Sequence, residues 1–140
     1  MLFRSPQQNL AHAHGADYSP DNRFAIVAVH GNDRIMVYRL NSAKGEMVSS
    51  APPFFQGEPG DGPRHVVFHP SGRFVYALNE ISATATVLSF DVKRGALAQL
   101  QRIPTLPPEY KDTNATAELV IDRAGKFLYA SNREIGRAHV

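Results

Sequence analysis

The sequence contains no cysteine and no tryptophan among its 140 residues. Without thiols, disulfides and thiolate metal sites are excluded. No apolar run approaches the roughly 18 residues of a membrane-spanning helix, so we expect no membrane partner. Fifteen basic residues nearly balance 13 acidic ones, and no basic run is interleaved with aromatic residues, so we expect no nucleic-acid partner. No signal peptide is visible, but we expect the true N-terminus to be missing, so this absence says little about the compartment. We predict a cytoplasmic location.

The chain is organised around the stretch from Gly62 to Glu80, GPRHVVFHPSGRFVYALNE. Two short apolar runs flank a His-Pro-Ser-Gly-Arg segment, which is typical of a tight antiparallel hairpin. Pro70 presets a turn φ, and Gly72 supplies the positive φ that such a turn needs. Because the two open ends of a hairpin lie together, Arg64 and Glu80 are expected at one rim of the sheet.

This hairpin recurs along the chain. Its anchor phenylalanines, Phe24, Phe74 and Phe127, are 50 and 53 residues apart, a spacing typical of repeat proteins. Two further strands are predicted after each of the first two hairpins, at 34–40 and 47–55 and at 84–91 and 97–103. Four strands in about 50 residues is the pattern of a β-propeller blade.

We therefore predict an all-β fold, a β-propeller of which this chain supplies about two and a half four-stranded blades. The blades are expected at approximately 11–56, 62–104 and 114–133, within a partial propeller domain over residues 1–133. A closed propeller has at least about four blades, so we expect the chain to be a fragment of a larger ring. An unrelated β-sandwich with chance similarity is the alternative.

Residues 134–140 depart from the repeat. Where a loop and a third strand are expected, the sequence reads Glu-Ile-Gly-Arg-Ala-His-Val, which looks like the translation of a common sequencing-adapter oligonucleotide. Our hypothesis is that genuine sequence stops at Arg133 and that the tail is non-native read-through. His139 is then expected to have no function.

Candidate site residues follow from placing the three hairpins in register. The residues that enter each hairpin lie ten positions before its anchor phenylalanine and are His14, Arg64 and Ala117. The residues that leave it lie six positions after the anchor and are His30, Glu80 and Arg133. In a propeller these strand ends fall on one face of the ring, around the central channel. We predict that His14, Arg64, Glu80 and Arg133 share one rim, with His12 and His65 nearby.

A histidine, a carboxylate and two guanidiniums at a channel mouth suit a small anionic substrate. Arginine binds carboxylate or phosphate bidentately, and His14 or Glu80 can act as a general base on water. Arg64 and Glu80 could instead form a structural ion pair. His12 and His14 alternate along a strand, but two imidazoles without a third ligand make a poor metal site, so we expect no metal and no cofactor.

Other polar residues rank lower. His69 lies in the hairpin turn on the opposite face and is interpreted as a turn residue. His30 shares the register of Glu80, but its Gly-Asn-Asp context is typical of a loop. The connection over residues 105–116 is long enough to act as a lid over the channel mouth, with Tyr110 and Lys111 as possible contacts.

Several motifs now resemble a known family, and they cover nearly all of residues 11–133. They are His12-Ala-His14, Asp33-Arg-Ile-Met-Val-Tyr38, Gly62-Pro-Arg-His65, Phe68-His-Pro70, Asn79-Glu80 and Leu128-Tyr-Ala-Ser-Asn-Arg133. The sequence is similar to the lactonase family of seven-bladed propellers, which includes the propeller-type 6-phosphogluconolactonases and the fungal carboxy-cis,cis-muconate cyclases. Many members have Asp-Leu-Gly where this chain has Val29-His30-Gly31, so a rim carboxylate is missing here.

The resemblance implies hydrolysis of a sugar lactone, with 6-phosphoglucono-1,5-lactone of the pentose phosphate route as the expected substrate. The site proposed for the family falls on His14, Arg64, Glu80 and Arg133. Cycloisomerisation of a muconolactone uses similar anion-binding groups and stays an alternative. A non-catalytic propeller that binds a protein or glycan through the same face is a second one, and the oligomeric state is left open.

Overall fold

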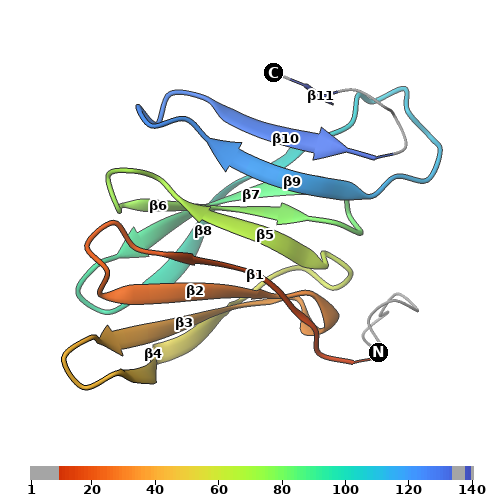
Figure 1. The fold of residues 1–140 in the computed structure, drawn as a ribbon. Coiled ribbons are helices and arrows are strands. Elements are labelled where there is room, and N and C mark those ends of the chain that lie inside the picture. Colours follow the sequence, from red (N-terminus) through yellow and green to blue (C-terminus); the bar gives the residue numbers. More distant parts are fainter. Residues whose placement is uncertain (1–9, 134–137, 140) are drawn as a thin grey trace.

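The computed structural model describes residues 10–133 and 138–139, which form three antiparallel sheets stacked like the blades of a fan (Figure 1). The predicted all-β propeller fold is confirmed. The first sheet contains β1 (Ala13–Tyr18), β2 (Phe24–Val29), β3 (Arg34–Asn41) and β4 (Glu46–Gln56). The second contains β5 (Pro63–Phe68), β6 (Phe74–Asn79), β7 (Thr84–Asp91) and β8 (Ala96–Pro104). The third contains β9 (Thr116–Ile121), β10 (Leu128–Asn132) and β11 (Ala138–His139).

The hairpin of β5 and β6 has the predicted turn. The amide of His69 donates to the carbonyl of Phe74 at 2.9 Å, and the amide of Gly72 donates to the carbonyl of His69 at 2.8 Å. Gly72 has a φ of 70°, in the left-handed region that glycine enters without steric cost. The equivalent turns of all three sheets gather at the left of Figure 1, away from the strand ends that the sequence marks as the rim.

The first two sheets pack face to face through aromatic rings. Phe90 of β7 lies between Phe24 of β2 and Phe68 of β5, with ring centroids 5.1 Å apart in both pairs and nearly perpendicular planes. Edge-to-face packing of this kind adds to the free energy gained by burying the rings. Ile26 and Val75, both fully buried, belong to the same core. The sheets are therefore fixed relative to each other by one shared core.

Each inner strand contains an irregularity at the rim end. Pairing skips His14 in β1, because Ala13 faces Val29 whereas Gly15 faces Ala28. It skips Arg64 in β5 in the same way. A β-bulge re-aims a side chain relative to the regular alternation, and bulges are frequent beside active sites. His14 and Arg64, the two candidates that lie at the entry of their hairpins, are thus the bulged residues of their strands.

The turn ends of the second and third sheets are joined by His69. Its Nδ1 lies 2.8 Å from the hydroxyl of Ser71, and its Nε2 lies 3.1 Å from the carbonyl oxygen of Gly125. Its ring also packs edge-on against Phe74. These contacts give the imidazole a structural role in the turn, at the end of the sheets opposite to the rim.

The predicted read-through tail lies mostly outside the described residues. Only the backbone of Ala138–His139 is described there, paired with Ala130 and Ser131 of β10. The non-native origin of residues 134–140 and the blade boundaries inferred from the repeat stay predictions. The one helical segment of residues 10–133 is a 3-10 turn at His30–Asn32, and no described helix could span a bilayer.

Two glycines at equivalent turn positions provide a matched test of the packing between the first two sheets. Gly45 and Gly95 have φ values of 66° and 68°. A Cβ on Gly95 would lie 2.5 Å from the Phe24 ring and 2.6 Å from the Ser50 hydroxyl, whereas a Cβ on Gly45 would meet nothing within 4 Å. We expect Gly45→Ala to lower the free energy of unfolding by about 1–2 kcal/mol, the cost of a left-handed alanine. Gly95→Ala should cost about 1–3 kcal/mol more, because Phe24 must move.

Urea denaturation of both variants measures this difference. Equal losses of unfolding free energy would show that the first two sheets do not pack closely at Gly95.

Candidate functional site

The Glu80 carboxylate, directly after β6, contacts basic side chains from all three sheets. Its Oε2 lies 3.2 Å from Nη1 of Arg64 on β5 and 3.3 Å from Nε2 of His30, which follows β2. Its Oε1 lies 3.1 Å from Nη1 of Arg133, which follows β10. The Glu80 side chain is only 17% exposed, so these ion pairs are partly shielded from water. Both carboxylate oxygens are therefore already engaged.

Arg64 connects this carboxylate to the first sheet. Its Nε donates to the carbonyl of Ala117 at 2.9 Å, and its Nη1 lies 2.5 Å from Nε2 of His14. Gly15 lets β1 approach β5 here, since a Cβ on it would lie 2.5 Å from the Arg64 carbonyl oxygen. A guanidinium has donors only, so Nε2 of His14 must be the acceptor and carry no proton. The imidazole in this arrangement is neutral.

The electrostatics around His14 favour the same protonation state. Partial burial lowers the pKa of His14 below its ordinary value of 6.5, and the positive charge of Arg64 and the neighbouring His65 lower it further. The Glu80 carboxylate acts in the opposite direction but is outweighed. A neutral imidazole near pH 7 can accept a proton from water.

His65 lies close to His14 but has a different partner. The two rings are 5.5 Å apart, and Nδ1 of His65 lies 3.0 Å from Oε1 of Glu118 on β9. Glu118 was not among the sequence candidates. It directly follows Ala117, the third member of the entry register, and that spacing was the available signal.

His12 is not brought into this network. Its side chain is exposed and makes no hydrogen bond to another residue in the described part of the chain, although its carbonyl accepts from the amide of His30 at 2.7 Å. The expected alternation of His12 and His14 along one strand is wrong, because β1 starts at Ala13 and is bulged at His14. A substrate-binding role for His12 stays a prediction.

His30 was ranked below the other candidates because of its loop context, and the structure places it directly beside Glu80. It is 8% exposed and pairs with Glu80. The 3-10 turn that begins at His30 ends at Asp33, whose left-handed backbone (φ 56°) and buried carboxylate fix the loop. That carboxylate accepts hydrogen bonds from the amides of Gly60 and Gly62. The loop chemistry thus positions His30 at the site.

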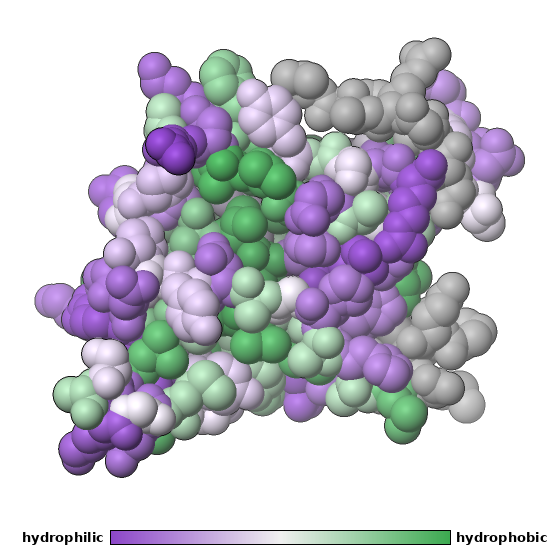
Figure 2. Space-filling model, viewed as in Figure 1, coloured by the Kyte–Doolittle hydropathy of each residue, from purple (hydrophilic) through white to green (hydrophobic). Residues whose placement is uncertain are grey.

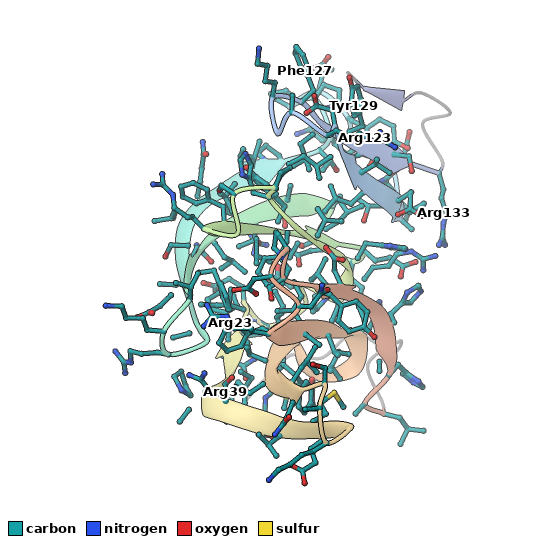
Figure 3. All side chains as sticks on the ribbon, turned by 60° about the vertical axis from the view of Figure 1, so that its left-hand side comes forward. Arg23, Arg39, Arg123, Phe127, Tyr129 and Arg133 are labelled. Carbon is teal, nitrogen blue, oxygen red and sulfur yellow. The ribbon has the colours of Figure 1, made fainter. Side chains whose placement is uncertain are left out.

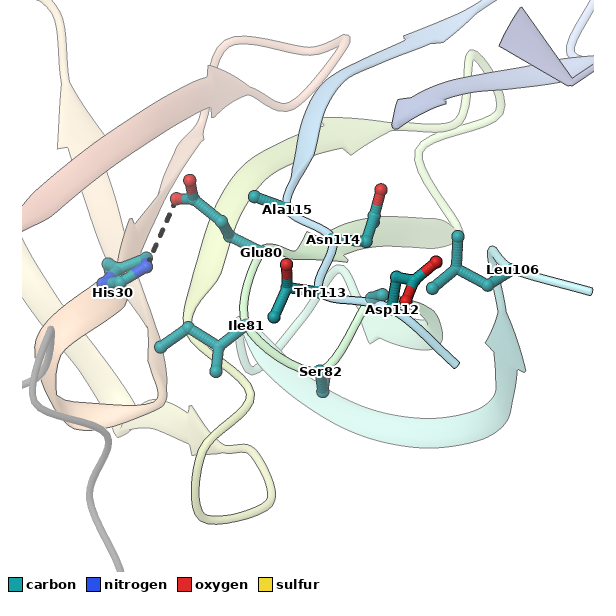
Figure 4. Close-up of a pocket in the computed structure, with 10 residues that line it drawn as sticks. His30, Glu80, Ile81, Ser82, Leu106, Asp112, Thr113, Asn114 and Ala115 are labelled. Atoms are coloured by element: carbon teal, nitrogen blue, oxygen red, sulfur yellow. Dashed lines mark ion pairs between the residues drawn. The ribbon is translucent and has the colours of Figure 1, made fainter. Parts of the chain in front are cut away.

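A pocket of about 500 Å³ opens beside Glu80 (Figure 4). His30 and Glu80 form one side of it, joined by their ion pair, and the connection between β8 and β9 forms the other. Its lining residues are His30, Glu80, Ile81, Ser82, Ala83, Leu106, Asp112, Thr113, Asn114 and Ala115. This volume is in the usual range for small-molecule sites.

The connection between β8 and β9, expected as a lid, is fastened at both ends by Asn132. Its amide nitrogen donates to the carbonyl of Thr105 at 3.1 Å, and its oxygen accepts from Nδ2 of Asn114 at 2.8 Å. Tyr110 and Lys111 do not line the pocket. The hydroxyl of Tyr110 donates to the Thr113 carbonyl and Nζ of Lys111 to the Pro108 carbonyl, so both side chains stay within the connection.

Arg133 is the most accessible cation of the site. Its side chain is 43% exposed and leaves the end of β10 toward the neighbouring sheet, whereas Arg23 and Arg39 lie at the far end of the molecule (Figure 3). In the space-filling view hydrophilic residues gather over the right-hand strand ends, where this site lies (Figure 2). An accessible guanidinium on a polar rim can bind an anion from solution.

These features define a class of protein: a segment of a β-propeller whose rim combines two arginines, a neutral histidine and a pocket. More specifically, the chain belongs to the lactonase, 7-bladed beta-propeller family, whose sequence model matches residues 3–139.

Individual relatives agree with this membership. A protein of Lactococcus lactis subsp. cremoris is 39% identical over 128 residues, which cover 91% of this chain and 36% of that protein. A protein named 6-phosphogluconolactonase from Sodalis glossinidius is 32% identical over 126 residues, covering 90% and 38% of the two chains. The chain thus spans little more than a third of the length of these relatives.

Solved structures are similar to this chain over nearly its whole length. A crystal structure of a Lactobacillus plantarum protein matches with a TM-score of 0.85 and 35% identity, covering 92% of this chain and 37% of that one. The periplasmic gluconolactonase of Pseudomonas aeruginosa matches with a TM-score of 0.83 and 31% identity, over 92% and 36%. Because that relative is described as periplasmic, the cytoplasmic location inferred above stays a prediction.

The opposing charges around His14 allow a titration test. Replacing Arg64 by Met should raise the pKa of His14, because a neighbouring positive charge is lost, but not fully to 6.5, because burial is the larger cause. Replacing Glu80 by Gln should lower it further, because the one favourable negative charge is lost. NMR titration of the imidazole in both variants measures these shifts. Shifts of the same sign would contradict the described arrangement.

Proposed function

We propose that this chain forms part of a lactonase that hydrolyses a sugar lactone, with 6-phosphoglucono-1,5-lactone as its substrate. The observation that supports this most directly is the neutral imidazole of His14, which lies 2.5 Å from a guanidinium nitrogen of Arg64. A base for water and a positive group for a developing oxyanion are thus adjacent. Ester hydrolysis needs both groups at the same carbonyl carbon.

In the proposed mechanism His14 is the general base. Its Nε2 removes a proton from water as that water attacks the lactone carbonyl, and Arg64 stabilises the negative charge on the carbonyl oxygen. When the tetrahedral intermediate collapses, the bond from the carbonyl carbon to the ring oxygen breaks, and the ring oxygen takes the proton from the imidazolium. The product is the open-chain acid. In the structure Arg64 occupies the Nε2 lone pair of His14, so the guanidinium has to move from Nε2 to the carbonyl oxygen when the substrate binds, which frees Nε2 to accept the proton of water.

Glu80 is the alternative base, and its surroundings favour a positioning role instead. Its two oxygens face the Arg64 and Arg133 guanidiniums and the His30 imidazole at 3.1–3.3 Å, so removing a proton from water would compete with two guanidiniums. A carboxylate in this setting orients the guanidiniums. Arg133, the more exposed of the two arginines, is left to bind the phosphate of the substrate.

The activity is proposed for a seven-bladed protein that contains this chain. The chain corresponds to 36–38% of the length of its relatives, and a channel mouth is formed by the whole ring. We expect the 140-residue chain alone to be inactive. Turnover by the isolated chain would contradict this expectation.

The assignment can be tested by substitution in such a seven-bladed protein. We expect Arg64→Ala to lower kcat/KM for 6-phosphogluconolactone by about 10²-fold or more, because oxyanion stabilisation is lost. Glu80→Gln should have a comparable effect, because both arginines lose their common partner. The kcat/KM of both variants is measured from the acid that is released as the lactone is hydrolysed.

Arg23→Ala is the matched control, since Arg23 is exposed at the far end of the sheets and pairs only with Asp21 in the described part of the chain. It should leave kcat/KM unchanged. Near-normal turnover by both site variants would refute the assignment. Turnover of a muconolactone in place of the sugar lactone would favour the cycloisomerase, and binding without turnover of either would favour a binding module.

The pH dependence provides a separate test of His14 as the base. The proposed reaction requires the neutral imidazole, and the pKa of His14 is lowered from 6.5 by burial and by Arg64. Activity should therefore be fully present above pH 6.5 and fall only as the pH drops through this lower pKa. The acidic limb of the pH profile of kcat/KM reports this group in the free enzyme. A limb centred at or above pH 6.5 would exclude His14.

A further inference from the structure

The pocket beside Glu80 contains hydrogen-bonding groups that the proposed mechanism does not use. We propose that it binds the hydroxyl-bearing part of the lactone, and that Asp112 and Thr113 determine specificity for a polyhydroxylated ring. This inference rests on the function proposed above and adds the orientation of the substrate to it.

Three acceptors in the pocket are unengaged. The Asp112 carboxylate and the Thr113 hydroxyl have no hydrogen bond or ion pair with any described residue, although both line the pocket. The side-chain oxygen of Asn114 is buried and has no hydrogen-bond partner among the described residues. Buried polar atoms are nearly always paired, so the unpaired Asn114 oxygen marks a place for a hydrogen-bond donor. Asp112 and Thr113 are exposed, so their oxygens are open to a ligand in the pocket. Sugar hydroxyls are donors of this kind.

The remaining walls suit the other surface of a sugar ring. Ile81, Ala83, Leu106 and Ala115 contribute apolar side chains to the same pocket. Small-molecule sites typically combine an apolar lining with a few polar groups that fix orientation. A pyranose-sized lactone presents C–H groups to such walls and hydroxyls to the acceptors.

Charge decides which end of the substrate enters the pocket. Asp112 and Glu80 both line it, and two carboxylates disfavour an anion. Arg133 pairs with the Oε1 oxygen of Glu80 and does not line the pocket. The phosphate is therefore assigned to the Arg133 side of Glu80, and the neutral hydroxyls to the pocket side.

The polar groups of the pocket are held in place by the sheet. Asn132, at the end of β10, receives a hydrogen bond from Asn114 and donates one to the Thr105 carbonyl. The Thr105 hydroxyl in turn donates to the carbonyl of Ala83 at 2.9 Å. Asp112 and Thr113 lie within a connection fastened at both ends, so their acceptors are positioned before the substrate binds.

The test compares two lactones in a seven-bladed protein that contains this chain. Glucono-1,5-lactone has the ring hydroxyls, whereas δ-valerolactone has the same six-membered ring without them. We expect Thr113→Val and Asp112→Ala each to lower kcat/KM for gluconolactone by about 10-fold, the effect of one lost hydrogen bond. Both variants should change kcat/KM for δ-valerolactone by less than about 2-fold. Glu109→Gln, an exposed carboxylate of the same connection outside the pocket, is the control and should change neither.

Equal losses with both lactones, or no loss with either, would overturn the inference. Binding of 1,5-anhydroglucitol, a ring polyol without a carbonyl, is measured by calorimetry in parallel. If the wild-type protein hydrolyses neither of these lactones and does not hydrolyse 6-phosphogluconolactone either, the proposed function fails. The pocket assignment then stands only if Thr113→Val weakens 1,5-anhydroglucitol binding about 10-fold while Glu109→Gln does not. Absence of binding would overturn it as well.

Discussion

The ion pairs of one carboxylate connect all three sheets at the rim. Glu80 belongs to the second sheet, yet it pairs with His30 from the first and Arg133 from the third, as well as with Arg64 of its own sheet. Removing one partner of a partly buried ion pair leaves charge uncompensated, so these groups depend on one another. The site is therefore a property of the interface between blades and is absent from any single blade.

Two structural devices place the basic groups around that carboxylate. The bulges at His14 and Arg64 interrupt the regular pairing of β1 and β5, so each residue is an extra one at the rim end of its strand. The close approach at Gly15 then brings the two strands together. As a result His14 faces Arg64 across the blade boundary, and partial burial together with the guanidinium lowers the pKa of the imidazole. The contact between Arg64 and His14 thus both joins the two sheets and favours the neutral imidazole.

The division of the site around Glu80 explains how one rim can handle a substrate with unlike ends. Cations lie on one side, together with the neutral His14, and hydroxyl-sized acceptors and apolar walls lie on the other. Membership of the lactonase propeller family gives this arrangement a chemical context.

The sequence by itself determined the blade repeat, because apolar alternation, turn glycines and a period near 50 residues are local signals that survive without tertiary contacts. It also selected His14, Arg64, Glu80 and Arg133, because equivalent positions of repeated hairpins fall on one face. The repeat register also put His30 at the rim, but only the tertiary structure showed it buried against Glu80, placed Glu118 beside His65, left His12 outside the network, and formed the pocket at Asp112 and Thr113. Their positions depend on bulges, a 3-10 turn and a loop fastened by a distant asparagine. Such contacts join residues far apart in the chain, and no local pattern specifies them.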